Sequence, residues 1–256
     1  GAFLFYVSLC KDFQMINSVR NTVLAIINKN NYGYISPSDF NLFAKQAQLD
    51  IFDEYFINYN QQINEENARV SGTGYADIKL GYEEVIDTFS VTNQLTQNNN
   101  NTYFLPSTIT TGNDYYLLTN VLCSSGGIYQ GEAEKVSNTK IKLLNTSLLT
   151  GPSNQYPAYT QQADLISVFP ATFNGANDIE AIYIRYPKDP KWTYITLYNG
   201  EPMFDQTQAD YQDFELPIDD ANDLVSKILQ YAGVSIREAD VVAFGQFEEQ
   251  TQSKED

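Results

Sequence analysis

The sequence predicts an α+β fold, with an N-terminal helical hairpin or bundle, a β-rich middle and C-terminal helices. Apolar residues recur at three- and four-residue spacing from Met15 to Arg69, as on one face of a helix. Alternating apolar and polar residues then dominate as far as Pro217, and helical spacing returns after it. Nothing repeats at a fixed period and strands do not alternate regularly with helices, so a doubly wound parallel sheet is not expected.

Two consecutive N-terminal helices have clear boundary signals. The first is expected from Met15, with buried positions at Ile16, Val19, Val23, Ile26 and Ile27. Gly33 can take the left-handed conformation that ends a helix. Ser36 is expected as the N-cap of the second helix, with Pro37 at its first position and Asp39 in its first turn.

The second helix carries a long aromatic row. Its apolar positions are Phe40, Phe43, Ala44, Ala47, Ile51, Phe52, Tyr55, Phe56, Tyr59 and Ile63. This row is too wide for a helical hairpin to bury alone, so part of it is expected to contact other subunits. The expected subunit or partner contacts are Phe52, Tyr55, Phe56, Tyr59, Phe244 and Phe247.

The middle of the chain is expected to be mostly strand. A helix is expected over Ala76–Thr88, before strands at Asp114–Leu122, Ile128–Val136, Leu165–Phe169, Ile179–Tyr186 and Thr193–Tyr198. Asn98–Asn101 is expected as a loop tip before a β segment that starts at Thr102. The last two strands are expected to form a hairpin through Pro187–Pro190. One helix is expected to start at Ser137 and to stop at Gly151-Pro152.

The C-terminal segment is expected to form two helices. Asp219 or Asp220 is expected to cap the first helix, and Gly233 is expected to end it. The buried face of this helix is expected to consist of Ala221, Leu224, Val225, Ile228, Leu229 and Ala232. Ser235–Glu238 reads as a capping box for the second helix.

These elements suggest five segments. Residues 1–14 are expected to be an extension before a natural start at Met15, or alternatively a short strand. Residues 15–95 are the helical domain, 96–217 the β-rich region, 218–247 C-terminal helices packed on the helical domain, and 248–256 a polar tail.

Composition argues against several functions. The net charge of −17 makes sequence-specific nucleic-acid binding unexpected, because such a chain repels phosphates. No segment approaches the roughly 18 apolar residues of a membrane helix, so no membrane partner is expected. The absence of histidine excludes His-based triads and His metal ligands. Cys10 and Cys123 are expected to be free thiols, with one disulfide as the alternative.

No motif indicates catalysis or a cofactor. Gly72 and Gly74 follow a helix rather than a strand, so they do not indicate a dinucleotide fold. Ser124–Gly127 reads as a turn. Asp219, Asp220 and Asp223 could hold a hard cation weakly, but their place at a helix start favours capping. We therefore expect no enzyme activity, cofactor or metal, although a two-carboxylate glycosidase stays open as a third alternative.

Three stretches resemble virion structural proteins of tailed phages, notably crAss-like podoviruses. They are Asn17–Leu24 (NSVRNTVL), Asn31–Asn41 (NYGYISPSDFN) and Phe43–Asp50 (FAKQAQLD). Phe214–Pro217 (FELP), followed by an amphipathic helix, resembles the same group. The resemblance covers Met15–Phe89 and Phe214–Gly233, and the large β-rich middle departs from a simple helical adaptor.

The resemblance implies a non-enzymatic ring subunit in the portal–tail assembly of a phage. Such a protein forms a cyclic homo-oligomer of about twelve copies and contacts the portal and other tail proteins. It is located in the virion tail or connector after assembly in the host cytoplasm, and DNA passes through its lumen. The acidic balance agrees with a conduit, because a negative lumen repels DNA. The alternative is a β-rich carbohydrate- or receptor-binding tail or adhesin module.

Overall fold

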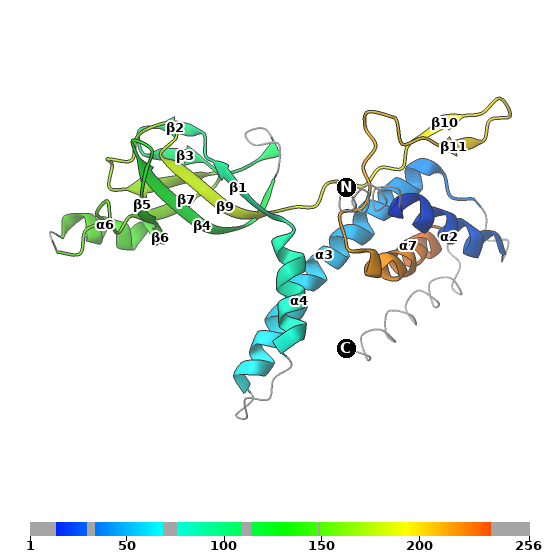
Figure 1. Cartoon of the computed structure of the whole chain (residues 1–256), viewed down its shortest axis with the longest axis horizontal. Helices are drawn as coiled ribbons and strands as arrows, with labels where there is room; N and C mark the ends of the chain where they lie inside the picture. Colours follow the sequence, from blue (N-terminus) through cyan, green and yellow to red (C-terminus); the bar gives the residue numbers. More distant parts are fainter. Residues whose placement is uncertain (1–13, 30–33, 69–75, 109–113, 148, 237–256) are drawn as a thin grey trace, which may run out of the picture. The chain divides into compact units, whose positions relative to one another are not determined.

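The computed structural model describes residues 14–29, 34–68, 76–108, 114–147 and 149–236 (Figure 1). It has an α+β fold, as the sequence predicts, with helices at both ends of the described chain and a β-rich middle. The chain divides into two compact units. The helical unit comprises residues 1–82 and 187–256, and the β unit comprises residues 83–186. This division differs from the boundaries expected after residues 95 and 217, because residues 187–217 belong with the helices.

Helices α2 (Met15–Lys29), α3 (Pro37–Ala68) and α7 (Ala221–Ile236) build the helical unit. Helix α7 packs against both α2 and α3. The expected cap of α3 is confirmed, since the Asp39 amide donates a 3.2 Å hydrogen bond to Ser36 Oγ. The cap of α2 comes from far along the chain: the amides of Met15 and Ile16 donate to the Asp213 carboxylate at 3.0 and 2.8 Å.

Two expectations for the C-terminal segment are wrong. Gly233 does not end α7, which continues to Ile236 because its packing on α2 and α3 outweighs the weak helix propensity of one glycine. Asp219 and Asp220 lie in the short 3₁₀ helix η2 (Ile218–Asp220) before α7, rather than at its N-cap. Gly33, residues 1–13, the second C-terminal helix and the polar tail lie outside the described residues.

Helix α4 (Ala76–Asp87) crosses from the helical unit into the β unit, close to the expected Ala76–Thr88. In the β unit, one sheet has the order β1-β9-β4-β5, with strands at Ser90–Gln94, Ile179–Arg185, Tyr115–Ser125 and Ile128–Glu132. The other has the order β2-β3-β8-β7-β6, with strands at Gln97–Asn99, Thr102–Phe104, Leu165–Phe169, Ala158–Gln162 and Glu134–Lys135. Strands β1, β2 and β7 were not anticipated from the sequence, and β2 covers part of the expected loop tip at Asn98–Asn101.

One core joins the two sheets of the β unit. It contains Val121, Cys123, Ile179, Ala181 and Tyr183 from the first sheet, and Tyr103, Tyr159, Ile166 and Val168 from the second. Helix α6 (Asn138–Thr146) connects β6 to the parallel strand β7 and packs Ile141 against Val136 and Ala158. Its expected cap is confirmed, because Ser137 Oγ accepts a hydrogen bond from the Lys140 amide at 3.3 Å.

The expected hairpin between Ile179–Tyr186 and Thr193–Tyr198 is wrong. Strand β9 lies between β1 and β4 in the β unit, whereas β10 (Tyr194–Thr196) pairs with β11 (Pro202–Phe204) in the helical unit. The chain passes from one unit to the other after Tyr186, so the proline-containing segment is a connection between units. We call residues 191–212, which contain β10 and β11, the arm (Figure 1).

Candidate interaction surfaces

The aromatic row of α3 is largely covered by the chain itself. Phe52 and Tyr55, expected as partner contacts, are buried, with 0% and 7% of their surface exposed. Phe56 and Tyr59 are half-buried, and Phe56 meets Phe52 edge to face at 5.1 Å. Contact of these residues with a partner stays a prediction, and Phe244 and Phe247 lie outside the described residues.

A row of polar contacts fixes α7 along α3. The hydroxyl of Tyr55 donates to the Asp220 carboxylate, and Lys227 Nζ lies 2.6 Å from Glu54 Oε1. Burial, together with the nearby charges of Asp223, Asp219 and Glu54, raises the pKa of Asp220. Burial and the hydrogen bond to Asp220 raise the pKa of Tyr55. Asp220 and Glu54 are therefore engaged in holding η2 and α7 against α3.

A cluster around Trp192 anchors the base of the arm to α2 and α3. Trp192 is 2% exposed, and its Nε1–H donates to Asn17 Oδ1 at 3.1 Å. The Arg20 guanidinium lies 3.8 Å from the centre of the indole ring and is itself buried. Asn41 on α3 accepts from the backbone amide of Trp192 at 2.8 Å and donates to its carbonyl at 3.2 Å.

Two aromatic residues of the arm continue this cluster. Tyr194 and Phe204 face each other across the two strands, and both stack on Trp192, with ring centres 5.6 and 5.8 Å away. Phe204 also meets Tyr211 edge to face at 5.8 Å. One face of the arm is therefore fixed to the helical unit by stacked rings.

The opposite face of the arm exposes apolar side chains. Ile195 pairs with Met203, and their side chains are 39% and 46% exposed. Leu197 is 40% exposed and follows Ile195 at two-residue spacing, so it lies on the same face. Tyr198 in the turn is fully exposed. The turn closes with Gly200 at φ +86°, and the Gly200 amide donates to the Leu197 carbonyl at 2.9 Å.

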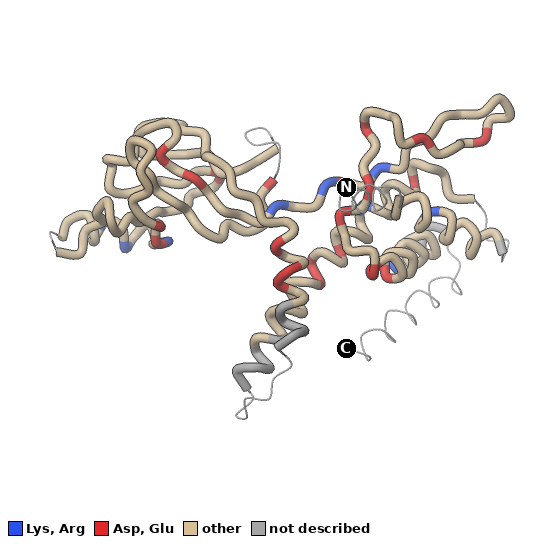
Figure 2. Tube along the Cα trace, viewed as in Figure 1, with Lys and Arg blue, Asp and Glu red and all other residues tan. Residues whose placement is uncertain are grey.

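The arm is acidic as well as apolar (Figure 2). It carries Glu201, Asp205 and Asp210, and after Lys191 at its base the next cation in the sequence is Lys227. Lys191 pairs with Asp210, which leaves the two acids nearer the tip without an ion pair among the described residues. The sequence contained a signal for this hairpin, because Asn199-Gly200 is a common turn between two short apolar runs.

A basic and apolar surface lies on and beside α6 in the β unit. Lys140 and Leu143 share one side of α6 at three-residue spacing, and Lys142 is also exposed. Leu143 is 68% exposed, Leu149 is 97% exposed and Tyr156 is 78% exposed. Within the described residues, no ion pair is recorded for either lysine. We call Lys140, Lys142, Leu143, Leu149 and Tyr156 the α6 surface.

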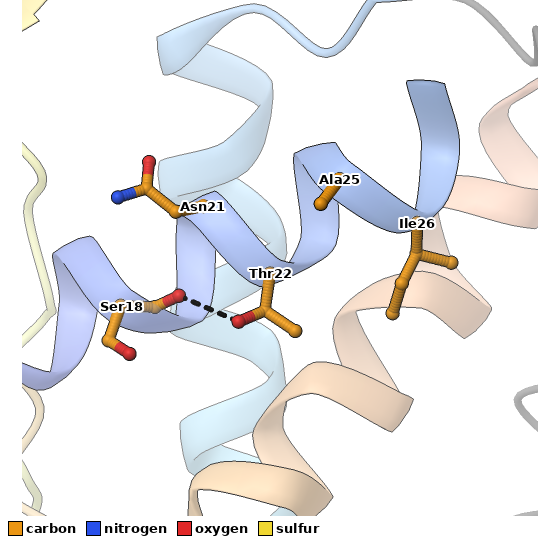
Figure 3. Close-up of a pocket in the computed structure, with 5 residues that line it drawn as sticks. All are labelled: Ser18, Asn21, Thr22, Ala25 and Ile26. Atoms are coloured by element: carbon orange, nitrogen blue, oxygen red, sulfur yellow. Dashed lines mark hydrogen bonds between the residues drawn. The ribbon is translucent and has the colours of Figure 1, made fainter. Parts of the chain in front are cut away.

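The outward side of α2 forms a shallow hollow of about 500 Å³. Ser18, Asn21, Thr22, Ala25 and Ile26 line it (Figure 3). They recur at helical spacing, and the Thr22 hydroxyl donates back to the Ser18 carbonyl at 3.0 Å. The lining residues include no acidic or basic side chain, and Ile26 is the largest apolar side chain among them.

A second hollow, of about 660 Å³, lies at one end of the β unit. It combines the exposed ring of Tyr129 with polar side chains of Gln94, Asn177, Asp178 and Glu180. The Asp178 carboxylate accepts from the Gly175 amide at 2.7 Å, which fixes the loop that borders the hollow. Burial, assisted by the charge of Asp178, raises the pKa of the adjacent Cys123 thiol to about 12.

The described residues show neither a metal site nor a membrane-spanning helix. Among the described residues, no group of three or more Cys, Asp or Glu side chains is arranged to hold a metal ion. No helix in the described part of the chain is long and apolar enough to cross a membrane. Comparison of the sequence with protein-family models and with curated proteins gave no match.

Proposed function

We propose that this chain is a non-enzymatic structural protein of a tailed-phage virion that forms a ring in the portal–tail assembly. The observation that supports this most directly is the arm, whose inner face is fixed by Trp192 while Ile195, Leu197 and Met203 face outward. An isolated two-stranded hairpin is only marginally stable in water. Exposed apolar side chains on a firmly anchored hairpin are typical of a surface that another protein covers.

The charge of the chain agrees with a ring around DNA. A net charge of −17 per subunit is multiplied by the copy number in a closed homo-oligomer. Acidic side chains lining a channel repel the phosphate backbone, so DNA slides through without binding. In this proposal the partners are copies of the chain itself, the portal and other tail proteins, and the protein is located in the virion tail or connector.

Electron microscopy tests the ring, and virion proteomics tests the location. Purified protein at high concentration, or virions that contain it, should show rings of one fixed copy number. Mass spectrometry of purified virions should detect the chain at a constant ratio to the portal. Absence of the chain from the virion would refute the proposal. A ring whose channel surface is basic would refute the role as a DNA conduit.

A matched pair of variants links the ring to the arm. Replacing Ile195 and Met203 together by serine should abolish rings while leaving the far-UV circular dichroism spectrum unchanged, because both side chains point away from the helical unit. Replacing the exposed Ile128 of β5 by serine changes a comparable apolar side chain in the β unit and should leave rings intact.

A second candidate function is binding of carbohydrate by the β unit, as in a tail or adhesin module. The hollow beside Tyr129 favours it, since an exposed aromatic ring next to amide and carboxylate side chains suits the faces and hydroxyls of a sugar. A glycan array probed with the full chain and with a Tyr129→Ala variant tests this candidate. Binding that the variant loses would support it, and no binding by the full chain would reject it.

A further inference from the structure

The outward face of the arm has properties that restrict what can cover it. It is apolar along Ile195, Leu197 and Met203, and it ends in a fully exposed tyrosine. Glu201 and Asp205 flank these residues, and the segment between Lys191 and Lys227 contains no cation. A partner surface that buries this face must therefore combine apolar contact area with positive charge, because acids placed opposite Glu201 would repel it.

The chain itself carries a surface with this combination. The α6 surface has Lys140 and Lys142 beside Leu143, Leu149 and Tyr156, all exposed. Three lysines elsewhere in the described chain pair with acids: Lys45 lies 2.7 Å from Asp189, Lys227 lies 2.6 Å from Glu54, and Lys191 pairs with Asp210. The hollow on α2 is a poorer match, since its lining residues include no cation and only one large apolar side chain, Ile26.

In a closed ring, the arm of one copy of the chain can meet the α6 surface of a second copy. A closed ring needs a heterologous contact, in which two different patches of the subunit meet. The arm and the α6 surface are different patches with complementary charge. Each copy offers one of each, so every contact can be satisfied when the ring closes.

We propose that the arm of one copy binds the α6 surface of the next copy, with Tyr198 and Leu197 against Leu143 and Leu149 and with Glu201 near Lys142. This inference rests on the proposed ring. A stable pairwise interface usually buries about 800 Å² on each partner, more than a few side chains of the arm supply. The contact is therefore weak for one pair of subunits and is strengthened by closure of the ring.

Photocrosslinking from the tip of the arm tests the contact directly. A benzophenone amino acid replaces Tyr198, whose side chain is fully exposed and makes no packing contact that folding needs. Rings are assembled from an equal mixture of unlabelled and ¹⁵N-labelled chains and are then irradiated. Crosslinks between a light and a heavy chain, from position 198 to the peptide 138–149, are the expected result.

Charge reversal supplies the matched control. Lys142→Glu should lower the yield of this crosslink by about fivefold, as expected when one exposed ion pair becomes repulsive. Lys135→Glu makes the same change of charge in the same unit, on β6, and should leave the yield unchanged. Combining Lys142→Glu with Glu201→Lys should restore it, and the wild-type yield should fall as salt is raised.

The possible outcomes distinguish failure of the contact between the arm and the α6 surface from failure of the proposed function. Rings whose arm crosslinks elsewhere, only within one chain or not at all would overturn the inference and leave the ring standing. Equal losses with Lys142→Glu and Lys135→Glu would also overturn it. Failure to form rings, together with absence from virions, would instead refute the proposed function.

Discussion

The indole of Trp192 should decide whether the arm stays folded on the helical unit. Replacing a buried tryptophan by alanine typically costs about 3–5 kcal/mol through lost contacts and the cavity that remains. The Arg20 guanidinium, 3.8 Å from the ring centre, would also lose a partner worth up to about 2 kcal/mol in a desolvated place. Trp192→Ala should therefore cost about 3–7 kcal/mol, a large part of the stability of an ordinary domain.

Hydrogen exchange followed by mass spectrometry shows which segments of the chain lose stability in the Trp192→Ala variant. In Trp192→Ala, peptides covering 193–205 should exchange at nearly the rate of an unfolded chain, because a two-stranded hairpin without its anchor is not stable. Trp192→Phe retains a ring for Tyr194 and Phe204 to stack on but loses the 3.1 Å hydrogen bond to Asn17. It should show intermediate protection and a loss of about 2 kcal/mol in urea unfolding.

One exposed residue of the same arm serves as the control. Tyr198→Ala removes a fully exposed ring and should change the unfolding free energy by less than about 0.5 kcal/mol. Unchanged exchange of 193–205 in Trp192→Ala would refute the reasoning, because it would mean that the strands hold together without the stacked rings.

Three further predictions concern single groups. Asp213→Ala should lower the unfolding free energy by about 1–2 kcal/mol in urea titrations, because two amides at the start of α2 lose their acceptor. Asp220→Asn should raise the melting temperature at pH 7. The folded protein raises the pKa of Asp220, so its ionised form costs stability above that pKa, and the advantage of asparagine should disappear as the pH falls through it. Cys123 should resist iodoacetamide at pH 8 in the native protein and react in urea, since its pKa is about 12, and mass spectrometry of the modified peptide measures this.

Features set by neighbouring residues could be predicted from the sequence. The caps formed by Ser36 and Ser137 each depend on contacts within one helical turn, and both are confirmed. The start of α2 at Met15 is confirmed too, but its cap, Asp213, lies far along the chain and had no local signal. The boundaries of β8 at Leu165 and Phe169 are confirmed as well, because alternating side chains between turn residues determine them locally.

Strand pairing could not be read from the sequence in the same way. The expected partner of Ile179–Tyr186 was the next apolar run, but its real partners are β1 and β4, both far away in the sequence. Strand β1 has one large apolar side chain, Val91, in a run of five residues, so it gives almost no periodic signal. Its place in the sheet depends on the pairing with β9, and a local pattern does not contain that information.

For the candidate interaction surfaces on α3 and on the arm, the sequence predicted the apolar residues but not which of them are exposed. The long row of apolar side chains on α3 was evident from the sequence. The sequence did not show that the helical unit would bury Phe52 and Tyr55. Ile195, Leu197 and Tyr198 were assigned to a strand without a sign of which face would remain uncovered, and Met203 was assigned to no element. Exposure depends on tertiary packing, and the anchor at Trp192 joins residues more than 150 positions apart.

The β unit is inserted into the helical unit, and its two ends meet. Ser90 pairs with Ile184, and the Arg185 amide donates to the Phe89 carbonyl at 3.0 Å, so the chain enters and leaves at neighbouring points of one sheet. A short glycine–serine linker can therefore replace residues 90–184 without stretching the chain. Removing or exchanging this segment would leave the packing of α7 on α2 and α3 unchanged, because those contacts lie within the helical unit.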